Sequence, residues 1–115
     1  MEQLLWHLHV RYTVAYVVNL RTDTQRPIVS SSRFLRMLRD HDGSFKKTMR
    51  AYCEEMIVPQ CHNSFQLMLD YDFVQARVKA TGSLQYGYTK TNGERMLITV
   101  FPSRNSAYET IWVFS

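Results

Sequence analysis

Apolar and polar residues alternate in the last third of the chain, and a period of two is typical of half-buried β-strands. The stretches 84–88 and 96–100 each keep apolar side chains on one parity, and the stretch 108–114 follows a polar break. Asn92-Gly93 lies between the first two stretches. This pair is a strong hairpin signal, because both residues tolerate the positive φ of a type I′ turn. The pattern predicts three consecutive antiparallel strands.

The N-terminal part of the chain predicts a short helix followed by a pair of strands. Leu4, Leu5 and Leu8 fall on one side of a helix over about residues 1–10. Apolar residues then alternate through 12–20, which predicts a strand. A polar reversal is expected at 21–26, and a short strand at 27–30, which its proline confines to a sheet edge or a strand start.

Helical periodicity and capping residues predict the helices in the middle of the chain. Ser31 or Ser32 is expected to cap a helix that ends near residue 39, because serine oxygens accept hydrogen bonds from the first free N–H groups of a helix. Ser44 is expected to cap a second helix, which runs to about residue 57. The stretch 62–79 is predicted to be helical in two pieces, with Asp70 as the cap of the second.

This order of elements predicts an α+β domain. Strand pairs that flank a helical middle favour one antiparallel sheet of about five strands, two from the N-terminal part and three from the C-terminal part, with the helices between them. We therefore expect a short N-terminal helix at 1–10 and a single domain at 11–115. A chain of 115 residues, 45% of them hydrophobic, can fill one core without metal or disulfide links.

The chain carries few signs of a particular compartment or partner. No apolar run approaches the roughly 20 residues of a membrane-spanning helix, and the start lacks the basic region of a signal peptide. Cys53 and Cys61 do not form a disulfide framework, so reduced thiols are expected. These features favour a cytoplasmic protein without membrane contact, or a piece of a longer protein.

Three segments resemble the PAS-like sensor domains of bacterial multidomain signalling proteins. Residues 12–23 resemble their opening strand with its Asn-Leu-x-Thr turn. Residues 51–59 resemble the helix that leads into a His-Pro-Glu-Asp type motif, and residues 84–96 resemble the strand with a Tyr-x-Tyr pattern, the turn and the next strand. The likeness covers residues 12–115.

Two positions differ from the family pattern. Val58-Pro59-Gln60-Cys61 keeps only the proline of the His-Pro-Glu-Asp type motif. Thr89 stands where an arginine commonly follows the strand tyrosine. The roles that these family residues have are therefore not carried over to this chain.

The resemblance implies a PAS-like fold and a sensory, ligand-binding or dimerising role. Such a module acts on a covalently linked output domain, such as a histidine kinase or a GGDEF diguanylate cyclase, and is not catalytic by itself. The sequence contains no recognisable kinase motif and no GGDEF string. A homodimer is expected, with Leu4, Leu5 and Leu8 at its interface.

Aromatic residues on elements that a PAS fold turns inward are the candidates for a ligand pocket. Buried tyrosines need hydrogen-bond partners and can line a pocket with polar tips. These candidates are Tyr16, Phe34, Tyr52, Phe73, Tyr86 and Tyr88. The alternative is that they fill an ordinary core. The ligand would be a small molecule that the sequence does not identify, and no cofactor is expected.

The chain shows no pattern of metal ligands or catalytic residues. His7 and His9 diverge on a helix, and Cys53, Cys61 and His62 lack zinc-finger spacing. We therefore expect no metal site and no enzymatic activity. A small α+β enzyme or small-molecule-binding domain remains the alternative, and it would need acid and base groups that converge in a pocket.

The formal charge of +4 and the cations between residues 33 and 50 raise the question of nucleic-acid binding. Acidic residues are interleaved with these cations, and no helix-turn-helix or aromatic single-strand platform is recognisable. We therefore expect no nucleic-acid partner, and keep an anion-binding module as a third alternative.

Overall fold

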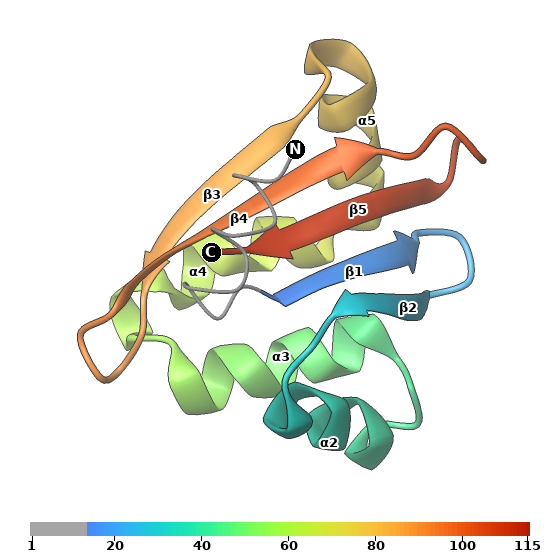
Figure 1. Cartoon of the computed structure of the whole chain (residues 1–115). Coiled ribbons are helices and arrows are strands. Elements are labelled where there is room, and N and C mark those ends of the chain that lie inside the picture. Colours follow the sequence, from blue (N-terminus) through green and yellow to red (C-terminus); the bar gives the residue numbers. More distant parts are fainter. Residues whose placement is uncertain (1–13) are drawn as a thin grey trace, which may run out of the picture.

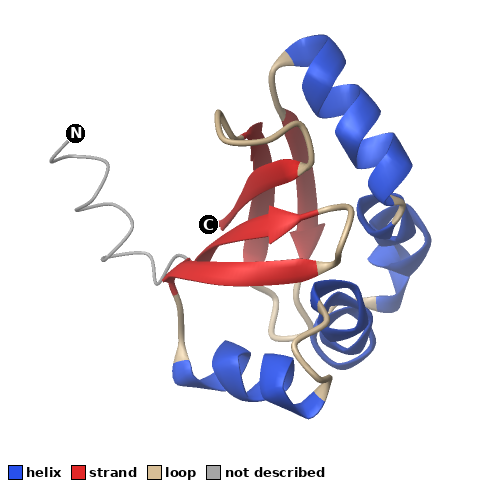
Figure 2. Cartoon of the chain, turned by 90° about the vertical axis from the view of Figure 1, so that its right-hand side faces the viewer, coloured by secondary structure: helices blue, strands red, loops and turns tan. Residues whose placement is uncertain are grey.

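A five-stranded antiparallel sheet, covered by helices on one side, forms the framework of the protein. The computed structural model describes residues 14–115 (Figures 1 and 2). The strands are β1 (Val14–Asn19), β2 (Thr24–Val29), β3 (Leu84–Thr89), β4 (Arg95–Pro102) and β5 (Glu109–Phe114). Their order in the sheet is β2-β1-β5-β4-β3. The predicted α+β class, with one sheet built from both ends of the chain, is confirmed and is compatible with a PAS-like fold. The predicted N-terminal helix lies outside the described residues.

The strand β2 starts earlier than its sequence indicates. Residues 21–26 were expected to form a reversal, but β2 begins at Thr24, and only a short turn separates it from β1. The polar residues of this segment lie on an edge strand, where polar side chains can remain in contact with water. Their polarity therefore does not require a loop. The expected edge position of Pro27 is confirmed, and the register of β1 with β2 shifts next to it.

The hairpin between β3 and β4 forms at the predicted place with a different turn. Of the Asn92-Gly93 pair only Gly93 has a positive φ, of 89°, so the expected type I′ turn, which needs two such residues, is wrong. The N–H of Gly93 donates to the carbonyl of Lys90 at 2.9 Å, and the N–H of Lys90 donates to the carbonyl of Glu94 at 2.8 Å. A left-handed glycine after a tight turn is typical of a three-residue hairpin loop.

Two capped helices follow β2, as the sequence predicts. The helix α2 (Ser32–Asp40) begins after Ser31, whose hydroxyl accepts from the N–H of Phe34 at 3.1 Å. The helix α3 (Phe45–Met56) begins after Ser44, whose hydroxyl accepts from the N–H of Lys47 at 3.1 Å. Each serine satisfies a free N–H group at the start of its helix and so fixes where the helix begins.

The second helical stretch is divided, as predicted, at Asp70. Three short segments precede this residue: η1 (Pro59–Cys61), α4 (His62–Phe65) and η2 (Gln66–Leu69). The helix α5 (Tyr71–Thr81) follows it, and a carboxylate oxygen of Asp70 accepts from the N–H of Phe73 at 3.2 Å. Gly82, at φ 85°, ends α5 in the left-handed conformation that glycine adopts without steric cost.

The core fills the space between the inner face of the sheet and the helices. Tyr16, Phe45 and Trp112 are fully buried near its centre, and the rings of Phe45 and Trp112 meet edge to face at 5.1 Å. The inward residues of β1 and β5 pair directly across the sheet, Tyr16 with Trp112. The middle of the sheet is therefore densely filled.

Candidate ligand pocket

A cavity of about 340 Å³ lies at one end of the sheet, beside the filled core. Three strand ends meet there: the start of β1, the end of β5 and the start of β4. The helices α2 and α3 and the β3–β4 turn complete its walls. The apolar lining consists of Val14, Phe34, Met37, Tyr52, Met56, Met96 and Phe114, and the polar lining consists of Ser31, Arg33, Lys90 and Glu94.

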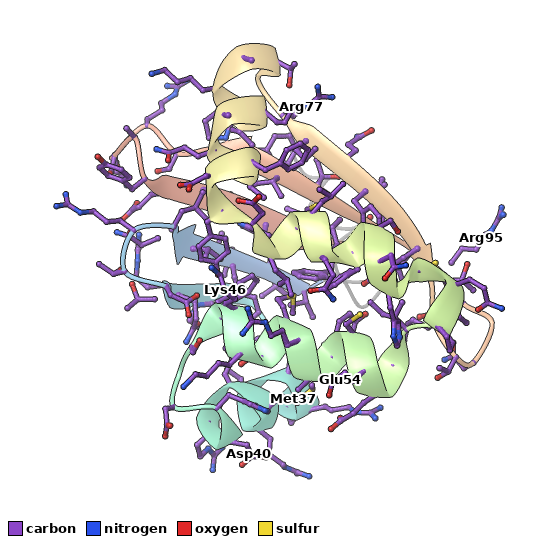
Figure 3. All side chains as sticks on the ribbon, turned by 180° about the vertical axis from the view of Figure 1, so that it is seen from behind. Met37, Asp40, Lys46, Glu54, Arg77 and Arg95 are labelled. Carbon is purple, nitrogen blue, oxygen red and sulfur yellow. The ribbon has the colours of Figure 1, made fainter. Side chains whose placement is uncertain are left out.

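Helical spacing brings the walls from α2 and α3 together. Phe34 and Met37 are three residues apart on α2, and Tyr52 and Met56 are four apart on α3, so each pair shares a helix face. Figure 3 places Met37 on the part of α2 that lies beside α3. The two faces meet over the strand ends, where the rings of Phe34 and Phe114 lie 5.9 Å apart.

The sheet register brings the remaining apolar walls together. Val14 pairs with Phe114 across β1 and β5, and Phe114 pairs with Ile98 across β5 and β4. Met96 lies two residues before Ile98 and therefore on the same face of β4. Since successive strands end at this point, side chains line the cavity here instead of filling it.

The β3–β4 turn is fastened to the end of α3 and closes one side of the cavity. The N–H of Thr91 donates to the carbonyl of Met56 at 2.9 Å, and the N–H of Val58 donates to the carbonyl of Thr89 at 3.0 Å. This attachment holds the two charged residues of the turn, Lys90 and Glu94, at the cavity.

The polar lining carries more positive than negative charge. Lys90 Nζ lies 3.3 Å from Glu94 Oε1, and the Lys90 side chain is only 18% exposed, against 56% for Glu94. Arg33 lies on the exposed part of α2 and has no ion-pair partner within residues 14–115. The lining therefore presents two cations and one carboxylate.

Two tyrosines form a buried polar contact behind the apolar wall. The hydroxyls of Tyr52 and Tyr88 lie 2.7 Å apart, and their rings meet edge to face at 6.0 Å. The pKa of each phenol lies above its ordinary value, and the main cause is burial. Both therefore stay protonated at neutral pH, so neither serves as a base, and of the two it is Tyr52 that lines the cavity and can hydrogen-bond to a ligand.

The structure brings two of the predicted pocket residues into the cavity. Phe34 and Tyr52 line it. Tyr88 lies behind Tyr52 and is hydrogen-bonded to it through the two hydroxyls. Tyr16 does not line it: this residue is fully buried in the core, and its hydroxyl contacts that of Ser30.

The other two predicted residues lie elsewhere. Tyr86 is stacked on Tyr88 with ring centroids 5.9 Å apart, and its hydroxyl meets the hydroxyl of Ser64 at 2.6 Å. Phe73 lies half-buried on α5, where it packs against the core. Neither residue belongs to the cavity lining.

Sequence reasoning did not select the methionines or the residues at the strand ends. Met37, Met56 and Met96 belong to apolar helix and strand faces, a pattern that does not distinguish a cavity wall from a core. Met56 and Met96 lie near the ends of their elements, where flexible thioethers adapt to irregular surfaces, whereas Met37 lies within α2 and gives no such signal. Val14 and Phe114 enter the wall only through strand pairing, for which the sequence has no local signal.

Two further properties concern residues 14–115 as a whole. Within this range no three His, Cys, Asp or Glu side chains gather as a metal-binding group. None of its helices combines the length and the apolar character needed to cross a bilayer.

The predicted interface residues Leu4, Leu5 and Leu8, and the pair His7 and His9, lie outside the described residues.

The sequence was compared with known proteins. It matches no model of a protein family, and a search of curated proteins finds no match. The cavity and the fold are therefore the basis for a functional proposal.

Proposed function

We propose that the chain is a PAS-like sensory module of a bacterial signal-transduction protein. It binds a small molecule in the cavity between α2, α3 and the β3–β4 turn, and it has no catalytic activity of its own. The cavity carries this proposal, because about 340 Å³ lies within the roughly 300–1,000 Å³ of small-molecule sites. The strand order and the resemblance of residues 12–115 to PAS-like sensors support the family assignment.

The lining favours an apolar or aromatic ligand that carries a carboxylate. Methionine and phenylalanine side chains make up most of the apolar lining, and the flexible methionines adapt to ligands of varied shape. Lys90 is held by Glu94, whereas Arg33 has no partner within residues 14–115. A ligand carboxylate would therefore pair with Arg33 and approach Lys90.

The position of the cavity favours a direct link from ligand to output. Val14 and Phe114 are paired neighbours in the sheet, and both line the cavity. A ligand that moves this wall would shift the start of β1 at Val14 and the end of β5 at Phe114. A covalently linked output domain at either side would respond. Both cysteines are free, which supports a cytoplasmic module with reduced thiols.

A small enzyme receives less support from the cavity. Among its described lining residues Glu94 is the single carboxylate, and it pairs with Lys90. The nearby phenols of Tyr52 and Tyr88 stay protonated. Within the described part of the lining, no acid and base groups converge in a way that favours a catalytic role.

Filling the cavity tests the proposal. We expect native mass spectrometry, or a thermal-shift panel of aromatic carboxylates, to detect a ligand for the 115-residue chain. Met56→Trp places a larger side chain in the cavity and should abolish this binding. Leu67→Trp, at a residue 51% exposed and outside the lining, is the matched control and should bind as the wild type does.

Two results would contradict the proposal. One is a ligand that binds Met56→Trp as tightly as the wild type. The other is a wild-type chain that neither carries a ligand nor is stabilised by any member of the panel.

A further inference from the structure

The two edges of the sheet differ in how well they are protected from other strands. β2 and β3 are the edge strands. β2 carries Arg26, Pro27 and a register shift, and these are the features by which natural sheets prevent further pairing. β3 has no charge and no proline, and its register runs unbroken from Leu84 to Thr89. β3 is therefore the less protected edge of the sheet, although its end is covered where Val58 donates to Thr89 and Ile57 pairs with Lys90.

The backbone groups that β3 turns outward can be identified from its neighbours. Leu97 of β4 exchanges both of its backbone hydrogen bonds with Ser115, at 2.8 and 2.9 Å, so these groups face β5. In an antiparallel sheet, its partner Gly87 must then turn its own N–H and C=O away from β4. By alternation Gln85 and Thr89 do the same. The carbonyl of Thr89 accepts from the N–H of Val58, which agrees with this direction.

The outward groups of Gln85 and Gly87 remain available. Within residues 14–115, no backbone group outside the sheet forms a hydrogen bond with the N–H or C=O of either residue. Both residues are exposed. They offer two donors and two acceptors in the spacing of an extended strand. Such a row of groups is a template for one more strand.

Gly87 itself is not required by the chain's own packing. Its φ is not positive, and a Cβ added to it would meet only the carbonyl oxygen of Met96, at 3.8 Å, which is an ordinary contact. A glycine inside a strand weakens it, and such a residue often marks a place where another backbone approaches. The glycine is thus consistent with a strand that docks from outside.

Two exposed arginines stand at the two ends of β3. Figure 3 shows Arg77 on α5 near the start of the strand and Arg95 near its other end. The Thr81 hydroxyl contacts the carbonyls of Arg77 and Ser83, which fixes this turn of α5 beside β3. Neither arginine has an ion-pair partner within residues 14–115.

We propose that the β3 edge binds an extended acidic peptide segment of another protein as a sixth strand. The outward groups of Gln85 and Gly87 would pair with the peptide backbone, and Arg77 and Arg95 would pair with acidic side chains toward its ends. A second copy of the chain fits less well. Antiparallel pairing of two β3 strands would bring Arg77 of each copy toward Arg95 of the other, and like charges repel. This inference does not depend on the ligand cavity.

Fluorescence anisotropy with a labelled synthetic peptide tests the proposal. The probe alternates valine and threonine and carries glutamates at both ends, and the comparison peptide carries lysines instead. Gly87→Pro removes the outward N–H but leaves the ladder to β4 intact. We expect it to weaken binding of the acidic probe about tenfold, which corresponds to about 1.4 kcal/mol. Gly87→Ala keeps this N–H and should bind about as the wild type does.

Two further measurements separate the parts of the proposal. Replacing both arginines, Arg77→Gln and Arg95→Gln, should weaken binding of the acidic probe and reduce its dependence on salt. N-methylation of alternate amides in the probe should abolish binding to the unmodified chain, so this result does not depend on how any variant folds.

The outcomes that would overturn the proposal are distinct. Equal binding of the acidic and lysine-ended peptides would contradict the role given to the two arginines. Undiminished binding of the N-methylated probe would contradict backbone pairing with β3. Self-association of the chain that Gly87→Pro abolishes would assign the edge to a second copy instead.

Discussion

The contact between Tyr52 and Tyr88 joins the helical layer to the sheet through a single buried hydrogen bond. Tyr52 is 8% exposed and Tyr88 is 4% exposed, so removing one hydroxyl leaves the other with little access to water. An unpaired buried hydroxyl costs more than the bond gains, because its hydration is lost without compensation. This contact also lies directly behind the apolar wall of the cavity, of which Tyr52 is part.

We predict that Tyr88→Phe lowers the free energy of unfolding by about 1–2 kcal/mol, since it leaves the Tyr52 hydroxyl unpaired. The double variant, Tyr52→Phe with Tyr88→Phe, should lose less than the sum of the two single variants. Urea denaturation of the four proteins measures this coupling. Strictly additive losses would show that the two hydroxyls do not depend on each other.

For single residues, the sequence predicts which side chains are buried better than it predicts their hydrogen-bond partners. The parity of Tyr86 and Tyr88 places both on the inner face of β3. The partner of Tyr88 is 36 positions away on α3, and no local pattern encodes this contact. The same holds for Asp23, whose carboxylate accepts from the N–H of Lys46 at 2.9 Å and from the Tyr71 hydroxyl at 2.6 Å.

The helices depend on capping residues that the sequence makes visible. Ser31, Ser44 and Asp70 each accept a hydrogen bond from the N–H group three residues later. These short-range contacts are encoded within one helical turn, so the starts of α2, α3 and α5 could be predicted.

We predict that Asp70→Ala lowers the free energy of unfolding by about 1 kcal/mol, because α5 loses its N-terminal cap. Asp72→Ala, which removes an exposed carboxylate from the first turn of the same helix, is the matched control and should cost only a few tenths of that. Thermal denaturation of both variants is the measurement. Equal losses would show that charge near the helix end matters and the capping bond does not.

The edge strand and the hairpin show where element-level prediction was wrong. The polar residues at the start of β2 resemble a turn, because one edge of this strand pairs with nothing in the sheet and most of its side chains are exposed. The Asn92-Gly93 pair marks the hairpin correctly, but the loop is one residue longer than the pair suggests. The carbonyl of Asn92's side chain instead accepts from the N–H of Glu94 at 2.9 Å.

For the whole molecule, the sheet order could be anticipated only as strands gathered from both ends of the chain. The pairing of β1 with β5 joins residues from opposite ends of the described range, and this pairing places Val14 beside Phe114. The cavity exists where these ends meet α2, α3 and the β3–β4 turn. Because five separate segments contribute, no single stretch of sequence indicated it.

We predict that the 115-residue chain forms a homodimer through Leu4, Leu5 and Leu8. Light scattering should give the mass of a dimer for the wild type and of a monomer for the double variant Leu5→Glu and Leu8→Glu, because buried charges without partners destabilise an interface. Leu67→Glu, at an exposed residue on η2, is the control and should remain dimeric. A wild-type chain that is already monomeric would contradict the prediction.

The claim that the cavity is a ligand site is tested most directly by NMR of methyl-labelled methionines. Met37, Met56 and Met96 line the cavity, whereas Met49 and Met68 are buried outside it and serve as internal references. Titration with the aromatic carboxylate that stabilises the chain best should shift the methyl signals of the first three and leave those of the two references in place. A ligand that shifts the reference signals and leaves the three cavity signals unchanged would contradict the account.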